Sequence, residues 1–444
     1  MYHLFANKVK TCPDDSFIYH RNRWHSFLDI NKNINKYSYF LSSIVEHGAY
    51  VGILLNNQLD LLKIYFSLLK LGAKPVFIYD DVSGDEILKF NKIHNINTVI
   101  TIEHYSSKFT EADIKVIFLD GIAKEKDCII HYNEDFFDTS LMNAYLFTSG
   151  STGEPKLVSL KWENFNSSAL AWGAMIPFKS NELYLCCIKL YHIAGLSIIS
   201  RSLIYGMQVI LLDYYNSHTI TSVGTTLKPK YISIIPKMFY DLVDDPDGLY
   251  FLSRLGVIIL GGDIIHNDLI DFSIKNNLNL FISYGMTETA SGVCGQWVNS
   301  KNYKKYSIGR PFPGVDLNIH DSGCLEISGK MVASNNSDLT LKKNKHLSSD
   351  LVEIDGDGFL YFKGRNDNIA LSGGKKIYIK KVEKVFLSHP DILSLSIDIG
   401  ESKIWGQNIT VFIKSVRPLS IPNLKKWLLK YLKPYEIPKK IKII

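Results

Sequence analysis

Between residue 50 and residue 285 the hydrophobic positions fall into short runs that alternate with segments of helical periodicity. Each short run is bounded by polar or glycine-containing turns, which predicts a buried strand, and alternating strands and helices indicate βαβ units with a parallel sheet. The predicted strands are Val51–Leu55, Lys74–Ile78, Asn97–Ile102, Lys115–Leu119, Ala144–Phe147, Leu183–Ile188, Gln208–Leu212, Tyr231–Ile235, Gly256–Leu260 and Asn279–Tyr284. The predicted helices are Leu59–Leu71, Asp85–Asn95, Ala194–Tyr205, Lys237–Val243 and Asp268–Asn276.

Beyond these elements the pattern changes. From Tyr303 to His346 the chain is strand-like and interrupted by glycines. The stretch from Gly364 to Asn368 is polar and has no periodicity, which predicts a linker between a large N-terminal domain and a small C-terminal one. A length of 444 residues is consistent with two or three domains.

Composition excludes several protein classes. The six cysteines are scattered without a Cys-x-x-Cys pair, which argues against a disulfide framework or a zinc site and is typical of a reducing cytoplasm. The N-terminus has no long apolar segment typical of a signal peptide, and no apolar run is long enough to predict a membrane-spanning helix. We therefore predict a cytoplasmic protein with a sizeable core.

Charge is distributed unevenly along the chain. The net charge is +6, but residues 365–444 alone contain 16 Lys and Arg against 6 Asp and Glu, so the first 364 residues carry −4. A basic small domain suggests a partner that bears phosphate, either nucleic acid or a phosphorylated cofactor. A solvated lysine-rich face is the alternative interpretation of the same charges.

The most informative motif follows the predicted strand Ala144–Phe147. The chain continues as Thr148-Ser149-Gly150-Ser151-Thr152-Gly153 and then Glu154-Pro155-Lys156. Backbone N–H groups and hydroxyls in such a loop can bind a polyphosphate, and a lysine adds a positive charge. This is not a Walker loop, because Pro155 precedes the lysine. A surface turn is the alternative for any isolated Ser/Gly segment.

Three more motifs stand at the carboxyl ends of predicted strands, where open α/β sheets bind ligands. They are Tyr191-His192-Ile193-Ala194-Gly195, Leu260-Gly261-Gly262-Asp263 and Tyr284-Gly285-Met286-Thr287-Glu288. In the last motif the tyrosine can stack on adenine, the threonine can bind a phosphate and the carboxylate can hold Mg²⁺. A structural histidine and a tight βα turn are the alternatives for the first two motifs.

Together the motifs resemble those of the adenylate-forming superfamily, which contains acyl-CoA synthetases, luciferases and peptide-synthetase adenylation domains. Its phosphate loop reads Thr-Ser-Gly-Ser/Thr-Thr-Gly-x-Pro-Lys, and its second signature reads Tyr-Gly-x-Thr-Glu; both match here. The resemblance implies an α/β fold with parallel sheets flanked by helices, a β-rich subdomain and a small α+β C-terminal domain. It implies domains at 1–364 and 369–444, joined by a hinge at 365–368.

The resemblance also implies roles for individual residues. ATP or AMP would be bound by Thr148, Ser149, Gly150, Ser151, Thr152, Gly153, Gly261, Gly262, Tyr284, Gly285, Asp350 and Arg365. Catalysis would depend on Lys156, His192, Thr287 and Glu288, with Glu288 as the Mg²⁺ ligand. The acid would lie against His192, Gly195 and Arg201, although Arg201 could equally be a surface residue of its helix. Asp367 would be the pivot of the small domain, and Gly373 and Gly374 would face coenzyme A.

The chain departs from the family near its end. The segment Tyr378–Glu383 lacks a proline and a glutamate of the usual pattern. The family continues beyond the position of Pro438 to a Gly-Lys whose lysine contacts the reacting carboxylate, and these 444 residues do not reach it. We therefore expect these residues to form an adenylate slowly.

Within the superfamily, the runs Leu190–Ser197, Arg201–Met207 and Ile232–Met238 are most similar to o-succinylbenzoate–CoA ligases of menaquinone synthesis. The predicted activity is an AMP-forming acid–thiol ligase that uses ATP, Mg²⁺, coenzyme A and a small carboxylate, without nucleic acid. Two alternatives stay open: adenylation of another acid or transfer to a carrier protein, and a nucleotide-binding homologue with weakened catalysis. A homodimer also stays open.

Overall fold

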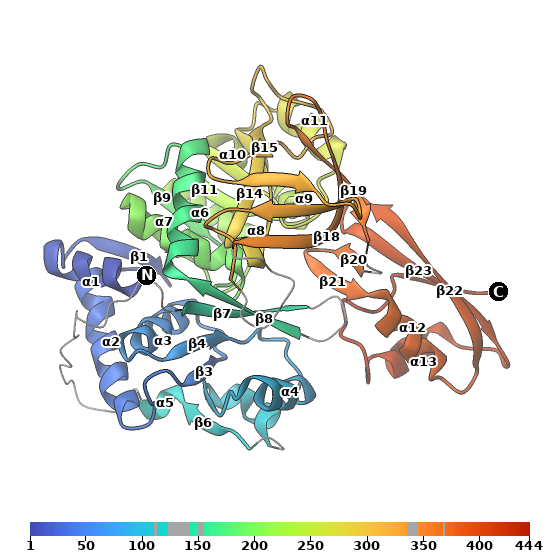
Figure 1. Ribbon diagram of the computed structural model, residues 1–444, viewed down its shortest axis with the longest axis horizontal. Helices are drawn as coiled ribbons and strands as arrows, with labels where there is room; N and C mark the ends of the chain where they lie inside the picture. The colour runs from blue at the N-terminus through green and yellow to red at the C-terminus, as the bar shows by residue number, and fades with distance from the viewer. Residues whose placement is uncertain (111–112, 123–141, 150–154, 335–343, 367–368) are drawn as a thin grey trace.

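The structure is a computed structural model that describes residues 1–110, 113–122, 142–149, 155–334, 344–366 and 369–444. Four sheets organise these residues, and Figure 1 shows the C-terminal part set to one side of the rest. Among the described residues no helix is both long enough and apolar enough to cross a membrane.

The first sheet is nearly all parallel. Its order is β6 (Lys115–Phe118), β5 (Thr98–Thr101), β3 (Tyr50–Ile53), β4 (Lys74–Phe77), β7 (Met142–Ser149) and β8 (Pro155–Lys161). Only the last pair, β7 with β8, is antiparallel, with Thr148 opposite Lys156. The loop that joins these two strands is the predicted phosphate loop, so its two ends emerge next to each other.

The second sheet has nine strands and a central parallel region. Its order is β15 (Arg310–Pro311), β14 (Ser291–Trp297), β13 (Leu280–Met286), β12 (Val257–Leu260), β11 (Tyr231–Ile234), β9 (Leu183–Cys186), β10 (Gln208–Leu211), β1 (Ser16–His20) and β2 (Arg23–Ser26). The strands from β13 to β1 pair in parallel, and β14, β15 and β2 at the two margins pair antiparallel. Strands β11 and β12 are buried throughout, which explains why they appear in the sequence as unbroken apolar runs.

Helices connect the strands and begin where the sequence supplies caps. Ser83 and Glu86 form a capping box at the start of α4, and Asn57 caps α3 through two backbone N–H groups. The remaining helices begin mostly after strand ends. The helices of these two layers are α1 (Tyr2–Thr11), α2 (Phe27–Ser42), α3 (Gln58–Lys70), α4 (Gly84–His94), α5 (Leu119–Ile122), α6 (Trp162–Met175), α7 (Ile193–Tyr205), α8 (Ser217–Leu227), α9 (Pro236–Asp244), α10 (Gly248–Arg254) and α11 (Asn267–Lys275).

The remaining two sheets are smaller. An antiparallel sheet follows the order β16 (Asp316–Ile319), β17 (Cys324–Ser328), β18 (Lys345–Ile354) and β19 (Leu360–Arg365). The C-terminal domain consists of β20 (Ile369–Ser372), β21 (Lys375–Tyr378), α12 (Ile379–Leu387), β22 (Ile392–Ser402), β23 (Gly406–Ser415), α13 (Ile421–Leu428) and β24 (Lys440–Ile443). It has a hydrophobic core of its own, which includes Val382, Phe386 and Val411.

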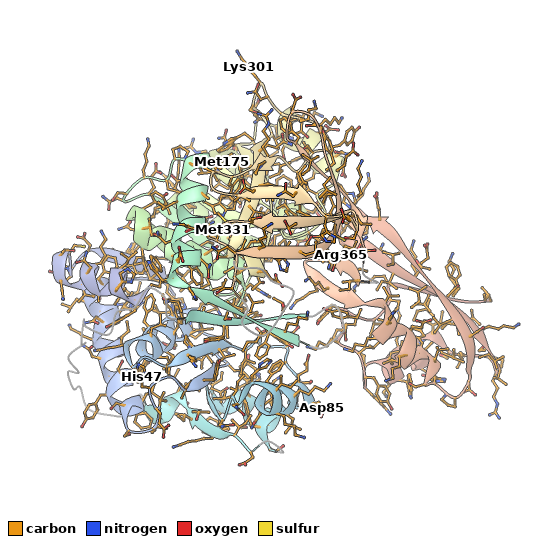
Figure 2. All side chains as sticks on the ribbon, in the orientation of Figure 1. His47, Asp85, Met175, Lys301, Met331 and Arg365 are labelled. Atoms are coloured by element: carbon orange, nitrogen blue, oxygen red, sulfur yellow. The ribbon has the colours of Figure 1, made fainter. Side chains whose placement is uncertain are left out.

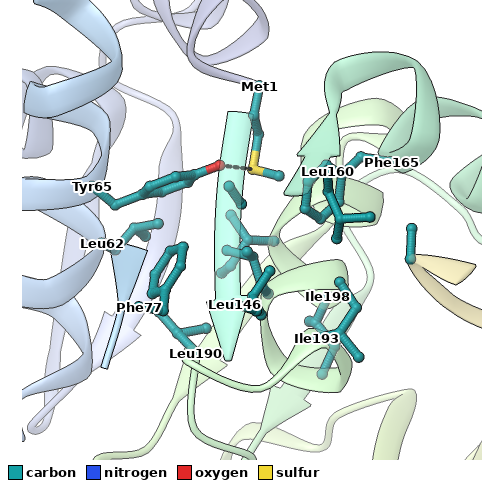
Figure 3. Close-up of a cluster of buried hydrophobic side chains, with 14 of the residues drawn as sticks. Met1, Leu62, Tyr65, Phe77, Leu146, Leu160, Phe165, Leu190, Ile193 and Ile198 are labelled. Carbon is teal, nitrogen blue, oxygen red and sulfur yellow. Dashed lines mark hydrogen bonds between the residues drawn. The ribbon is translucent and has the colours of Figure 1, made fainter. Parts of the chain in front are cut away.

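One hydrophobic core spans both large sheets. Figure 3 shows Phe77 and Leu146, from β4 and β7, facing the α7 residues Ile193 and Ile198. Leu190, just before α7, is fully buried in the same cluster. The core therefore fixes the position of the short loop that carries His192.

The predicted α/β fold class is confirmed, and the predicted strands and helices all form with ends displaced by at most about two residues. Several strands were not predicted, among them β1, β2, β14 and β8. Pro155 to Lys161 resembled the end of a loop, yet it forms β8 because it pairs across the chain with β7. The polar stretch that began at Gly364 is also partly structured, because Gly364 and Arg365 pair with β18 as the end of β19.

Candidate active site

A cavity of about 730 Å³ opens where the strand ends of both large sheets meet the small domain. The residues that line it come from regions far apart in the sequence. Of the predicted site residues, it brings together Thr148, Lys156, His192, Gly262, Tyr284, Gly285, Thr287, Glu288, Asp350, Arg365 and Gly374.

The other predicted residues are placed differently. Gly195, Arg201, Gly261 and Gly373 do not line the cavity, although Gly261 and Gly373 directly precede the lining residues Gly262 and Gly374. Ser149 is the last residue of β7. Five predicted residues lie outside the described part of the chain, and their assignments stay predictions: Gly150, Ser151, Thr152, Gly153 and Asp367.

A tightly paired cluster forms one end of the cavity. The Tyr284 hydroxyl donates a hydrogen bond to Asp350 Oδ2, and Arg365 Nη1 lies 2.7 Å from Asp350 Oδ1. Burial and the Asp350 charge raise the pKa of the Tyr284 phenol. Figure 2 shows Arg365 where the β19 end meets the C-terminal domain. The cluster presents an aromatic ring, a carboxylate and a guanidinium to one ligand, as nucleoside binding requires.

Beside this cluster, Gly262 lines the cavity and Gly261 packs directly before it on the β12 side. A Cβ added to Gly261 would lie 2.7 Å from both the carbonyl oxygen and the hydroxyl of Ser283, so a larger residue would separate β12 from β13. Gly262 has φ +82°, which other residues rarely adopt. The double glycine is therefore required for close packing at this point, and it leaves room for a flat ligand.

Another part of the cavity has charged groups of both signs. Lys156 is exposed on β8, and the carboxylate of Glu288 comes from a short 3₁₀ helix over Thr287–Thr289. The Glu288 carbonyl accepts a hydrogen bond of 2.7 Å from Ala333 N, which fixes the backbone there. The described residues contain no group of three His, Cys, Asp or Glu side chains arranged for a metal. Glu288 alone still fits Mg²⁺, which commonly takes one carboxylate and completes its shell with phosphates and water.

His192 forms the opposite end of the cavity. It precedes α7, and a Cβ at Gly195 would lie 2.5 Å from the Lys189 carbonyl, so the glycine permits this close turn. The Tyr191 hydroxyl donates to Asp80 at 2.7 Å, and Leu190 N donates to the side chain of Gln58 at 2.7 Å. The His192 side chain is exposed and lines the cavity. Desolvation by the surrounding protein, followed by the charge of Lys375, lowers the pKa of His192 to about 4. His192 is therefore neutral at pH 7.

The Gln58 contact is itself held by an ionic network. Asp213 accepts hydrogen bonds from Gln58 N at 2.9 Å and from Arg21 at 2.8 Å, and it lies 2.9 Å from His20 Nε2. Burial raises the pKa of Asp213, but the hydrogen bonds outweigh it and hold the pKa at about 2. The network joins β1, β10 and the start of α3, so it supports the His192 loop from behind.

Arg201 is not a surface residue, and the exposed alternative for it is wrong. Its side chain on α7 is 2% exposed, and its guanidinium lies 4.9 Å from the ring centre of Trp172. It donates to the Tyr184 hydroxyl at 3.4 Å, but Nε and Nη1 have no hydrogen-bond partner among the described residues. A buried cation without a carboxylate partner is costly, so the position points to an anionic ligand.

Arg201 is separated from the cavity by a short chain of contacts. Trp172 Nε1 donates to the Ser291 hydroxyl at 3.2 Å. The Ser291 carbonyl lies 2.1 Å from where a Cβ of Gly285 would be, and Gly285 lines the cavity. The guanidinium is therefore buried in the protein and is connected to the cavity lining through Trp172 and Ser291.

The small domain forms the last wall. Lys375 lies 3.3 Å from Asp81 and Lys433 lies 2.9 Å from Glu86, two ion pairs between the domains. Lys376 and Lys381 line the same cavity. The basic character predicted for this domain is therefore concentrated partly on the face that it turns toward the site.

Several residues that line the cavity were not predicted. His346 stands near Glu288 and Lys156, whose charges influence its pKa, and burial lowers that pKa. Asp263 follows the double glycine directly, and that place at a strand end was the one local sign of a role. Nothing in the local sequence marks His346 or Lys376.

Comparison with known proteins gives a consistent result. A sequence model of the family described as AMP-binding enzyme matches residues 5–332. The chain is 26% identical over 444 residues to 2-succinylbenzoate–CoA ligase of Bacillus cereus, and the alignment covers 96% of this chain and 91% of that protein.

Two solved structures of one Bacillus subtilis protein, o-succinylbenzoate CoA synthetase (MenE), have the same fold. A double mutant bound to the product analogue OSB-NCoA superposes with a TM-score of 0.89 and is 24% identical, covering 99% of this chain and 94% of that one. The form with ATP and a magnesium ion superposes with a TM-score of 0.77 and is 23% identical, covering 99% and 95%.

Proposed function

The chain belongs to the AMP-binding enzyme family, and from that membership we propose that it is an ATP-dependent acid–CoA ligase whose acid is o-succinylbenzoate. The observation that carries the proposal is the single cavity, which has the Tyr284 cluster at one end, His192 at the other and Gly374 of the small domain on its wall. A nucleotide, an acid and a thiol could therefore meet in one place. The product would be a thioester intermediate of menaquinone synthesis.

In the first half-reaction a carboxylate oxygen of the acid attacks the α-phosphorus of ATP. The bond to the bridging oxygen of the β-phosphate breaks, and pyrophosphate leaves with the electron pair. Negative charge accumulates on the phosphates, so Lys156 and the Thr287 hydroxyl would stabilise the transition state. Glu288 would hold Mg²⁺, which supplies additional positive charge to the phosphate oxygens when bound.

In the second half-reaction the coenzyme A sulfur, having lost its proton, attacks the acyl carbon. The bond between that carbon and the phosphate oxygen breaks, and AMP leaves. Neutral His192 can donate a hydrogen bond to the acyl oxygen without placing a second cation beside Lys375. The Gly373–Gly374 turn would face the thiol, and the segment 365–368 would be the hinge of the small domain.

Arg201 supports a dicarboxylic acid as the substrate. Arg201 belongs to α7, the helix that begins just after His192, and its two nitrogen atoms without a partner could pair with the second carboxylate of o-succinylbenzoate. A buried charged pair typically contributes several kcal/mol when one partner is removed. A substrate carboxylate would therefore supply the partner that the protein does not.

The test is pyrophosphate exchange across a panel of carboxylates. The decisive pair is o-succinylbenzoate and 4-oxo-4-phenylbutanoate, which lacks only the ring carboxylate. We expect the wild-type chain to prefer the diacid in kcat/KM by at least about 30-fold, and Arg201→Met to lose that preference. Equal use of both acids by the wild-type chain would refute the dicarboxylate assignment.

The acceptor is tested separately. The wild-type chain is given acyl-adenylate with either free coenzyme A or a carrier protein that bears a pantetheine arm. Thioester formation with free coenzyme A is expected. Transfer to the carrier protein alone would replace the ligase proposal with a carrier-loading enzyme, and ATP binding without any exchange would indicate a non-catalytic homologue.

A further inference from the structure

The turn of the small domain that lines the cavity is fastened to the large domain through one carboxylate. Asp263, which directly follows the double glycine after β12, accepts a hydrogen bond at Oδ2 from Gly374 N at 2.7 Å. Its Oδ1 accepts from Ile264 N at 2.7 Å, within its own loop. One oxygen therefore fixes the side chain, and the other holds the neighbouring domain.

The shape of the small domain fits around this carboxylate. A Cβ added to Gly406, at the start of β23, would lie 2.2 Å from Asp263 Oδ1. Gly374 and Gly406 have φ angles of +75° and +78°, which place their backbones close to the large domain in a way that other residues rarely permit. Two glycines from separate turns thus converge on a single side chain.

Other contacts of the same segment are further from the cavity. His266 Nε2 lies 2.7 Å from the Ser402 carbonyl oxygen, and Asp268 lies 3.6 Å from Lys403 in an exposed pair. Of Asp263, His266 and Asp268, only Asp263 lines the cavity. It therefore connects the nucleotide side of the site directly to the turn of the small domain.

We infer that Asp263 is a positioning residue for thioester formation: its carboxylate docks the Gly373–Gly374 turn on the cavity wall and so selects the domain arrangement of this structure. The inference rests on the proposed ligase function. Of the two Bacillus subtilis MenE structures, the one with the product analogue superposes better than the one with ATP and magnesium. The proposed adenylation step uses Lys156, Thr287 and Glu288 and not the Asp263 carboxylate.

The test separates the half-reactions. Asp263→Ala should reduce the conversion of supplied acyl-adenylate to thioester by about 10- to 100-fold, the usual effect of losing a charge-assisted hydrogen bond, while pyrophosphate exchange stays within about threefold. Asp263→Asn retains an oxygen acceptor and should recover part of the loss. Asp268→Asn, which removes the exposed ion pair with Lys403 but keeps an oxygen for the Tyr240 hydroxyl, is the matched control and should leave both rates unchanged. Equal loss of both half-reactions in Asp263→Ala would overturn the inference.

A double-mutant cycle tests the contact itself. Gly406→Ala introduces backbone strain in any background, but its collision with the carboxylate requires Asp263. The second-step loss from Gly406→Ala should therefore be smaller in the Asp263→Ala background than in the wild type. Additive losses would show that Gly406 and Asp263 do not act on each other.

Hydrogen exchange supplies a measurement that needs no activity. The Gly374 amide should exchange faster in Asp263→Ala than in the wild type, and at the wild-type rate in Asp268→Asn. An unchanged hydrogen-exchange rate of the Gly374 amide in Asp263→Ala would show that the carboxylate does not hold this turn, and the inference would be wrong. If the wild-type chain forms no thioester with any acid, the proposed function fails. The hydrogen-exchange result then tests the contact between Asp263 and Gly374 alone.

Discussion

Two buried charged groups are paired in opposite ways. At the Tyr284 end of the cavity, which we propose to bind the nucleotide, both oxygens of Asp350 take protein donors, from Tyr284 and Arg365. On α7, the helix that follows His192 at the proposed acid end, the fully buried Arg201 has two nitrogen atoms without a partner among the described residues. The first arrangement is complete before a ligand binds, whereas an anion would complete the second. In the proposed reaction adenosine is constant and the acid differs between enzymes, so a preformed nucleotide end and an incomplete acid end are consistent with a site that varies in its acid.

The largest effect is expected between the two ends, where the phosphates would react. Glu288→Gln keeps the shape of the side chain but removes the charge that would hold Mg²⁺. Pyrophosphate exchange should fall by about 100- to 1,000-fold, or about 3–4 kcal/mol of transition-state stabilisation, with little change in unfolding. The control is Glu163→Gln, since Glu163 is an exposed partner of Lys330. Exchange within a few-fold of wild type in Glu288→Gln would remove Glu288 from the mechanism.

The two buried arginines test the comparison directly through stability. Arg365→Met leaves Asp350 buried without its cation, which typically destabilises a protein by about 3–5 kcal/mol. Arg201→Met removes a cation that has no carboxylate partner among the described residues, so the free energy of unfolding should be unchanged or higher. Urea unfolding of both variants without ligands measures the difference. A large loss of stability in Arg201→Met would show that its aromatic neighbours compensate the charge and that no anion is needed there.

Much of this architecture could be predicted from local sequence. The elements that could not be predicted depend on pairing between residues that are apart in the sequence. Strands such as β11 and helices such as α4 are marked by apolar runs and caps, so their positions follow from nearby residues. By contrast, β8 forms because Thr148 pairs with Lys156 across a loop, and Arg365 ends a strand because Asp350 lies opposite it.

The site residues also separate into those marked by the local sequence and those placed by long-range packing. Residues within motifs, such as Glu288 and His192, were predicted because strand ends gather at one edge of a sheet. Asp263 received no role, and His346 and Lys376 were not singled out, because they reach the cavity only through the packing of separate sheets and domains. The sequence also did not indicate that Arg201 is buried, since an arginine on an apolar helix can extend its charged end to the surface.

The smallest expected effect concerns the Asp213 network, which supports the loop that carries His192 at the proposed acid end. Asp213 holds Gln58, which in turn holds the backbone of Leu190 beside His192. Because the pKa of Asp213 is lowered from 3.8 to about 2 in the folded protein, its ionised form stabilises the fold by about 2 kcal/mol. This contribution is fully present above pH 4 and is lost as the pH falls from about 4 to about 2.

Asp213→Asn resembles the protonated carboxyl, so it should be about 2 kcal/mol less stable than the wild type at pH 7, and the two should converge toward pH 2. Urea unfolding at several pH values measures the difference between the two chains, in which other titrating carboxylates cancel. A stability difference that stays constant between pH 7 and pH 2 would mean that the Asp213 charge does not stabilise this network. The position of the His192 loop would then depend on the hydrophobic core around Leu190 alone.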